Sequence, residues 1–310
     1  MNAAKQGKML VAVDGSERAM EMVRYISGFK PFQRIKLVLF MVENRIPEFF
    51  WDQKRQPHFE WRITGVKMWE KQHDRVVRQY MDKARAILLD AGFPPENVKA
   101  VIHERKVGIA RDILEEARKH YGAVAVSRRG RSRMQGLILG STTTKLLHIL
   151  SPMPLLVVGR SPLTGKVLVA MDNSSDAMKA VDYVAQTLGG DGVRVTLMHA
   201  IREGEAMEAE FPREPAKHHV EEDKEEMEKV FDQARNRLIK AGFEPAHINI
   251  QFITGAYSRA EAVIQEACRG GYGTIAVGRR GISRAHEFFM GRVSNKLIQV
   301  AREQAVWVIG

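Results

Sequence analysis

Short apolar runs alternate along the chain with longer segments in which apolar residues recur every three or four positions. The runs predict five strands in the first half, at 9–13, 35–42, 98–103, 123–126 and 155–158, and five in the second, at 167–171, 194–200, 248–253, 274–277 and 306–309. The intervening segments predict helices, in the first half at 16–29, 61–91, 109–120 and 141–150, with counterparts in the second. Because parallel strands need crossover connections of this kind, the alternation predicts an α/β fold with parallel sheets flanked by helices.

The predicted elements form two copies of one unit. KMLVAVDGSERAM, which starts at Lys8, returns as KVLVAMDNSSDAM at Lys166, and YGAVAVSRRGRS at Tyr121 returns as YGTIAVGRRGIS at Tyr272. Self-similarity of this kind marks a duplicated structural unit. The turn-forming stretch SPLTG at 161–165 predicts a linker, so we assign residues 1–160 to one domain and 161–310 to a second.

The composition is typical of a folded protein of two domains. The 310 residues exceed the usual size of a single core, and 45% of them are hydrophobic and 27% charged. No apolar stretch has the length of a signal peptide or a bilayer-spanning helix, and Cys268 is the single cysteine. We therefore expect a cytoplasmic protein with no membrane partner and no intramolecular disulfide, in which Cys268 fills a small core position.

The net charge of +11 comes from the first half alone. Residues 1–160 hold 29 Lys or Arg against 16 Asp or Glu, a net of +13, whereas residues 161–310 hold 19 against 21, a net of −2. We favour a solvated surface as the explanation, which predicts no nucleic-acid partner. A face that binds polyanions is the alternative.

The loops after the first and fourth predicted strands carry the candidate chemistry, because ligands of open α/β sheets bind beyond the carboxyl ends of the strands. After the fourth strand the two halves read SRRGRSRMQGLILGSTTTKLL and GRRGISRAHEFFMGRVSNKLI. Both contain a small residue, two residues, a glycine, nine residues and a glycine that opens a helix. Glycine permits close approach to a helix start, where unpaired N–H groups and the positive end of the helix dipole favour phosphate.

Each of these residue types also has a purely structural explanation. The glycines could serve only as turn and cap residues, although the recurrence of the whole pattern favours a ligand site. Asp14 and Asp172 end the first strands and could accept hydrogen bonds from a ribose or a base edge, or could cap the next helix. Ser16 and Ser175 are the other candidates for those caps.

Both halves resemble domains of the universal stress protein family. The resemblance is carried by VAVDGS or VAMDNS on the first strand, by the glycine spacing, and by SPMPLLVV at the last strand of the first half. It covers nearly the whole chain apart from 44–61 and 203–219. For the glycine-bearing branch of that family it implies two tandem, adenine nucleotide alpha hydrolase-like domains, each with a five-stranded parallel sheet of order 3-2-1-4-5. It also implies that the domains bind ATP, with any Mg²⁺ held mainly by the phosphates.

The family's nucleotide-binding positions map onto both halves. In the first half the resemblance places adenosine against Asp14, Val42, Val126, Ser127, Arg128 and Gly130, and phosphates against Gly140, Ser141, Thr142 and Thr143. In the second half the same roles fall to Asp172, Ala200, Val277, Gly278, Arg279, Gly281, Gly291, Arg292, Val293 and Ser294. Two positions depart from the family pattern, since Ser127 replaces the first glycine and Arg292 replaces a small hydroxyl residue.

The resemblance further implies that the last strands, 155–158 and 306–309, pair within the chain and cover two exposed sheet edges. A homodimer stays open. The aromatic insert at 49–69 is expected to form a packed cover or an interface rather than a lid. No P-loop and no signature pairing of nucleophile and base occurs, so we expect a nucleotide-binding stress regulator with little or no hydrolysis. The alternative is a nucleotide-free interaction scaffold whose sites have degenerated.

Overall fold

The computed structural model describes residues 7–43, 60–130, 139–160, 164–189, 192–202, 214–281 and 290–310. The first half contains β1 (Lys8–Val13), α2 (Glu17–Ser27), η1 (Lys30–Arg34), β2 (Lys36–Glu43), α4 (Glu60–Asp90), η4 (Pro95–Asn97), β3 (Val98–Glu104), α5 (Ile109–Ala117), β4 (Ala123–Ser127), α6 (Ser141–Ile149) and β5 (Leu155–Val158). The second half contains β6 (Lys166–Ala170), α7 (Ser175–Leu188), β7 (Arg194–Arg202), α8 (Glu214–Lys240), η6 (Pro245–His247), β8 (Ile248–Ala256), α9 (Arg259–Arg269), β9 (Thr274–Gly278), α10 (Arg292–Val300) and β10 (Ala305–Ile309). Every strand predicted from the sequence forms, with ends displaced by at most a few residues.

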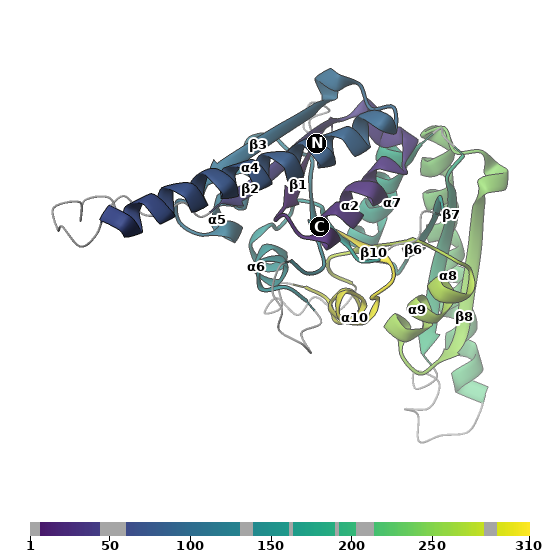
Figure 1. Cartoon of the computed structure of the whole chain (residues 1–310). Coiled ribbons are helices and arrows are strands. Elements are labelled where there is room, and N and C mark those ends of the chain that lie inside the picture. The colour runs from purple at the N-terminus through teal and green to yellow at the C-terminus, as the bar shows by residue number, and fades with distance from the viewer. Residues whose placement is uncertain are drawn as a thin grey trace.

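The strands of both halves join into one sheet (Figure 1). Its order is β3-β2-β1-β4-β5-β10-β9-β6-β7-β8, so each half has the predicted order 3-2-1-4-5. Within each half the neighbouring strands run parallel, and β5 and β10 pair antiparallel at the centre. Leu156 lies opposite Trp307 there, and the two residues occupy equivalent positions of the repeat. This is the pairing of last strands that the resemblance implies, and it leaves neither strand as an exposed edge.

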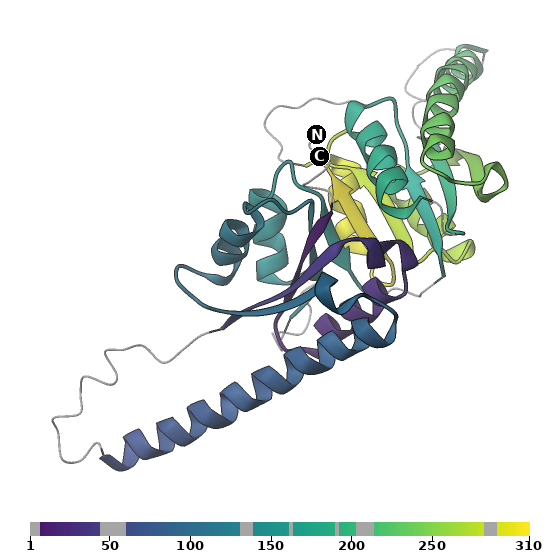
Figure 2. The same cartoon turned by 90° about the horizontal axis from the view of Figure 1, so that it is seen from above.

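Two layers of helices cover the sheet. One apolar core lies between the sheet and α2, α4, α7 and α8, and a second lies between the sheet and α5, α6, α9 and α10. Successive strand residues enter opposite cores, as Val11 and Leu10 do in β1, because side chains of a strand alternate between its faces. In Figure 2 α4, in blue, continues well beyond the edge of the sheet. Both cores include residues of both halves, so the halves stabilise one another.

Trp307 of β10 forms the centre of this shared packing. Its side chain is fully buried, and its ring lies 5.9 Å from that of Phe32 in the first half. Its Nε1 donates a hydrogen bond to Tyr25 Oη at 3.0 Å, and Tyr25 Oη lies 2.6 Å from Thr274 Oγ1. The group therefore links α2 of one half to β9 and β10 of the other.

The structure overturns the expectation for Cys268 and describes one aromatic side chain of the insert at 49–69. Cys268 is exposed and does not fill a core position. It follows the buried Ala267 in α9, and one residue step along a helix rotates the side chain by about 100°, here away from the core. In the aromatic insert, Trp69 is 52% exposed and stacks on His73, with ring centroids 4.8 Å apart. The insert's other aromatic side chains lie outside the described residues. In the part of the chain that is described, no helix is long and apolar enough to cross a membrane.

Candidate functional site

The aspartate that follows strand one touches the loop that follows strand four in each half. A Cβ atom added to Gly130 would lie 2.1 Å from Asp14 Oδ2, and one added to Gly281 would lie 2.5 Å from Asp172 Oδ2. A side chain at either glycine would therefore require the carboxylate to move. The second glycine of each motif lets the loop after the fourth strand approach this aspartate closely, in addition to any role in a turn.

The caps of α2 and α7 are serines, and the aspartates support them. Ser16 Oγ accepts a hydrogen bond from Ala19 N, and Ser174 Oγ accepts one from Ala177 N, both at 3.1 Å. The prediction of Ser175 as a cap was wrong by one position, because Ser174 has the extended backbone of a cap and Ser175 is already helical. Asp14 and Asp172 accept the N–H groups of Ser16 and Ser174, at 3.0 and 3.1 Å, and do not cap the helices themselves.

The helices that follow the glycine loops, α6 and α10, begin without a serine cap. α6 starts after Gly140 and α10 after Gly291, and neither glycine can offer a side-chain acceptor to the first turn. Each glycine is held in place by its own N–H, which donates to Arg128 O at 2.9 Å or to Arg279 O at 2.8 Å. The amides of the first turns are therefore the kind of donors that bind an anion at a helix start. Residues 131–138 and 282–289, which precede these helices, lie outside the described residues.

The side chains of the first turns of α6 and α10 are of two kinds, those open to solvent and those that are buried. Ser141 and Arg292 are exposed, and Thr142 and Val293 are half-buried. Thr143 and Ser294 are buried, and their hydroxyls donate to the strand carbonyls of Ser127 and Gly278, at 2.9 and 2.6 Å. Because a hydroxyl has one proton to donate, these two side chains do not have the free donor that a phosphate-binding role was expected to supply.

The side chains of Arg128 and Arg279 also depart from their predicted place beside an adenosine. Both are buried, and each crosses to the other half of the chain. Arg128 donates to the carbonyls of Ile298 and Ala301, and Arg279 Nη1 donates to Leu147 O at 2.7 Å. Burial lowers the pKa of Arg128 to about 10 and also lowers the pKa of Arg279. Only the backbone of these two residues faces the loops of its own half.

Gly278 and Ser127 occupy equivalent positions but have different surroundings. A Cβ on Gly278 would lie 2.6 Å from both Asp176 C and Ala177 N, so the start of α7 leaves no room for a side chain. Ser127 in the first half carries its side chain there and donates to Arg129 O at 2.8 Å. The departure of Ser127 from the family pattern is therefore accommodated by a looser approach of α2.

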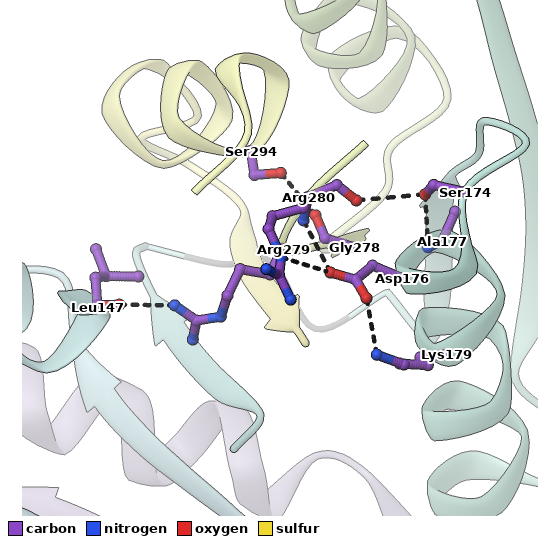
Figure 3. Close-up of polar contacts among 9 residues, drawn as sticks. All are labelled: Leu147, Ser174, Asp176, Ala177, Lys179, Gly278, Arg279, Arg280 and Ser294. Atoms are coloured by element: carbon purple, nitrogen blue, oxygen red, sulfur yellow. Dashed lines mark hydrogen bonds and ion pairs between the residues drawn. The ribbon is translucent and has the colours of Figure 1, made fainter. Parts of the chain in front are cut away.

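A polar cluster fixes the glycine loop of the second half to α7 (Figure 3). Buried Asp176 accepts hydrogen bonds from Arg280 N at 3.2 Å and from Lys179 Nζ at 2.8 Å, and Ser174 Oγ donates to Arg280 O at 3.3 Å. Sequence reasoning missed Asp176. The available signal was an acidic residue in a first helical turn, at a position where the first half has Arg18.

The remaining predicted residues lie along the same edge of the sheet. β1 lies between β2 and β4, and β6 between β7 and β9, so the carboxyl ends of these strands are neighbours. Val42 is half-buried near the end of β2, and Ala200 is buried in β7, where its carbonyl accepts from Arg259 Nε at 3.2 Å. Val126 and Val277 are buried in the strands that lead to the glycine loops. The structure thus brings the predicted residues of each half together.

The chemistry of this site is that of binding through backbone amides and one carboxylate. Uncapped helix starts can donate to phosphate oxygens, and Asp14 or Asp172 can accept from sugar hydroxyls. Among the described residues, no group of three or more His, Cys, Asp or Glu could hold a metal ion. The donor set fits an anionic ligand that also carries hydroxyl groups.

Comparisons with known proteins bear on the family and the fold of the chain. The sequence model of the universal stress protein family matches residues 164–309. The universal stress protein YxiE of Bacillus subtilis (strain 168) is 25% identical over 142 residues, which cover 44% of this chain and 93% of that protein.

Two solved structures share the fold over the whole chain. A universal stress protein from Archaeoglobus fulgidus DSM 4304 superposes with a TM-score of 0.61 at 18% identity and covers 99% of both chains. A functionally unknown protein from Pseudomonas aeruginosa PAO1 superposes with a TM-score of 0.53 at 16% identity and covers 100% of this chain and 94% of the other. The chain therefore has the fold of these proteins throughout. Its residues 164–309 match the sequence model of the universal stress protein family.

Proposed function

We propose that each half of the chain binds an adenine nucleotide, ATP, and that the protein is a stress-response regulator whose surface changes with nucleotide occupancy. The observation that carries this proposal is the pair of helix starts at Gly140 and Gly291, which have no side-chain cap and lie next to an aspartate in contact with a glycine loop. The same arrangement occurs at equivalent positions of both halves. The family match of the second half supports it.

The nucleotide would lie across the carboxyl ends of the central strands of each half. Amides of the first turns of α6 and α10 would bind the phosphates, and Asp14 and Asp172 would accept hydrogen bonds from the ribose. Exposed Arg292 adds a cation beside the phosphates in the second half, where the first half offers exposed Ser141. Mg²⁺ would be held mainly by the phosphates.

Binding with little or no hydrolysis agrees with the engagement of the nearby side chains. The hydroxyls of Thr143 and Ser294 already donate to strand carbonyls, and the guanidinium groups of Arg128 and Arg279 are directed into the interface between the halves. These groups are therefore not placed to position a water molecule or to stabilise a departing phosphate. ATP occupancy itself, rather than its turnover, would be the signal.

A nucleotide-free scaffold is the second candidate. It is favoured by the two departures from the family motif at Ser127 and Arg292, and by the burial of both loop arginines between the halves. Under this hypothesis the glycines would serve only the contact with Asp14 and Asp172.

The test begins with mass spectrometry of small molecules released when the purified chain is denatured, where we expect ATP or ADP. Stripped protein is then melted across an ATP titration. Free ATP at about 100 times Kd would stabilise a binding protein by about 2.7 kcal/mol per site.

The double variant Asp14→Ala with Asp172→Ala should lose this gain. The matched control replaces Asp82 and Asp232, which are exposed at equivalent positions of α4 and α8. A chain that releases no nucleotide and melts at one temperature at every ATP concentration would be the scaffold.

A further inference from the structure

Arg128 and Arg279 each connect the glycine loop of one half to a helix of the other half. In its own half, the carbonyl of Arg128 holds Gly140 at the start of α6, and the carbonyl of Arg279 holds Gly291 at the start of α10. Each arginine backbone is therefore part of the loop that precedes the helix start of its own site.

The side chain of each arginine binds the C-terminal end of the corresponding helix in the other half. Arg279 Nη1 donates to Leu147 O in the last turn of α6, as Figure 3 shows. Arg128 Nη1 donates to Ile298 O, the equivalent carbonyl of α10, and Arg128 Nη2 donates to Ala301 O. These five hydrogen bonds close a circuit in which the loop of each proposed nucleotide site binds the C-terminal end of the helix that begins at the other site.

The helices in this circuit are short enough to move as single bodies. α6 and α10 have 9 residues each, about 14 Å at a rise of 1.5 Å per residue. A small shift at the amide end, where a phosphate would bind, therefore displaces the carbonyl end that the opposite arginine holds. That arginine carries the displacement to the loop of its own site.

The guanidinium groups of Arg128 and Arg279 do not donate the same number of hydrogen bonds. This difference indicates a second way in which Arg279 could hold α6. The Nε of Arg128 and the Nε and Nη2 of Arg279 are buried and have no hydrogen-bond partner among the described residues. Arg279 Nη2 is the counterpart of the nitrogen with which Arg128 binds Ala301, and the carbonyl equivalent to that of Ala301 belongs to Leu150. A second hydrogen bond, from Arg279 Nη2 to Leu150 O, would hold the end of α6 as Arg128 holds the end of α10. Buried charged donors make such a difference energetically significant.

We infer that the two nucleotide sites are coupled, so that ATP bound in one half changes the affinity of the other through Arg128 and Arg279. This inference rests on the proposed function of both sites. By thermodynamic linkage the coupling acts with equal strength in both directions, and couplings between sites of one protein are typically about 5- to 150-fold in affinity.

The experiment measures ATP binding by calorimetry in the full chain with one site blocked. In the Asp172→Ala background only the first half binds, and adding Arg279→Met should change its ATP Kd by about 5-fold or more although Arg279 belongs to the other loop. Arg279→Lys, which keeps one donor for Leu147 O, should change it less. Arg269→Met, at an exposed arginine of α9, is the matched control and should leave the Kd unchanged. In the Asp14→Ala background, Arg128→Met should change binding in the second half in the same way.

The outcomes separate this inference from the proposal on which it rests. If Arg279→Met weakened only the second half, measured in the Asp14→Ala background, its action would be local and the coupling would be wrong, while ATP binding would stand. If neither blocked background bound ATP, both would be wrong. A melting curve of each variant checks the fold, and Arg279→Lys answers the question if Arg279→Met does not fold.

Discussion

The space around Gly278 gives a sharp prediction about why the two halves differ at the first glycine of the motif. Gly278→Ala places a Cβ atom 2.6 Å from Asp176 C and from Ala177 N, and both are backbone atoms that cannot move without the first turn of α7. Real Cβ atoms do not approach so closely, so α7 or the loop must shift. Overpacking of this kind typically costs about 1 to 3 kcal/mol, and a shift also weakens the hydrogen bond from Arg280 N to Asp176.

Ser127→Ala is the matched control, because it produces the same residue at the equivalent position. It keeps a Cβ that the first half already accommodates and loses only the hydrogen bond to Arg129 O, worth about 0.5 to 1.5 kcal/mol. Urea denaturation followed by circular dichroism gives the free energy of unfolding of each variant. A loss below about 0.5 kcal/mol for Gly278→Ala, the range of substitutions that touch nothing, would refute the argument from close approach.

Two further predictions concern the starts of helices. Ser174→Ala should lower the free energy of unfolding by about 1 kcal/mol, because the cap on Ala177 N is lost. Ser175→Ala should have almost no effect. Equal losses for the two variants in thermal unfolding would contradict the assignment of the cap to Ser174. Asp112 is buried, and although burial raises the pKa of its carboxyl, hydrogen bonds from the N–H groups of residues 106–108 lower it overall. Its stabilisation is therefore present above the carboxyl's unfolded pKa and lost as pH falls through the folded one, so Asp112→Asn should cost about 1.5 to 3 kcal/mol at neutral pH. That difference in melting should narrow as the pH falls below the carboxyl's unfolded pKa, and a difference independent of pH would contradict the prediction.

The order of strands in each half could be predicted because local pattern and resemblance pointed to the same fold. Apolar runs such as LVLFMV form buried parallel strands, and the segments between them bury one helical face each, so the elements follow from periodicity alone. The positions of the site residues followed in turn, because loops after neighbouring parallel strands meet at one edge. The glycines at 130 and 281 were identified by spacing, although spacing did not show that a carboxylate lies directly against each of them.

What the sequence by itself determined is the duplicated α/β unit, the glycine-opened helices and the candidate residues, since these depend on period and spacing within each half. Only the tertiary structure decided where the polar side chains go. Arg128 and Arg279 are charged loop residues in the sequence, yet they bind helix carbonyls of the opposite half, because antiparallel pairing of β5 with β10 brings each loop next to the other half's helix end. Contacts in the folded chain likewise decided which serines cap the helices and where the hydroxyl of Thr143 donates. The exposure of Cys268 depends on its angular position on α9, which the linear pattern did not resolve to one residue.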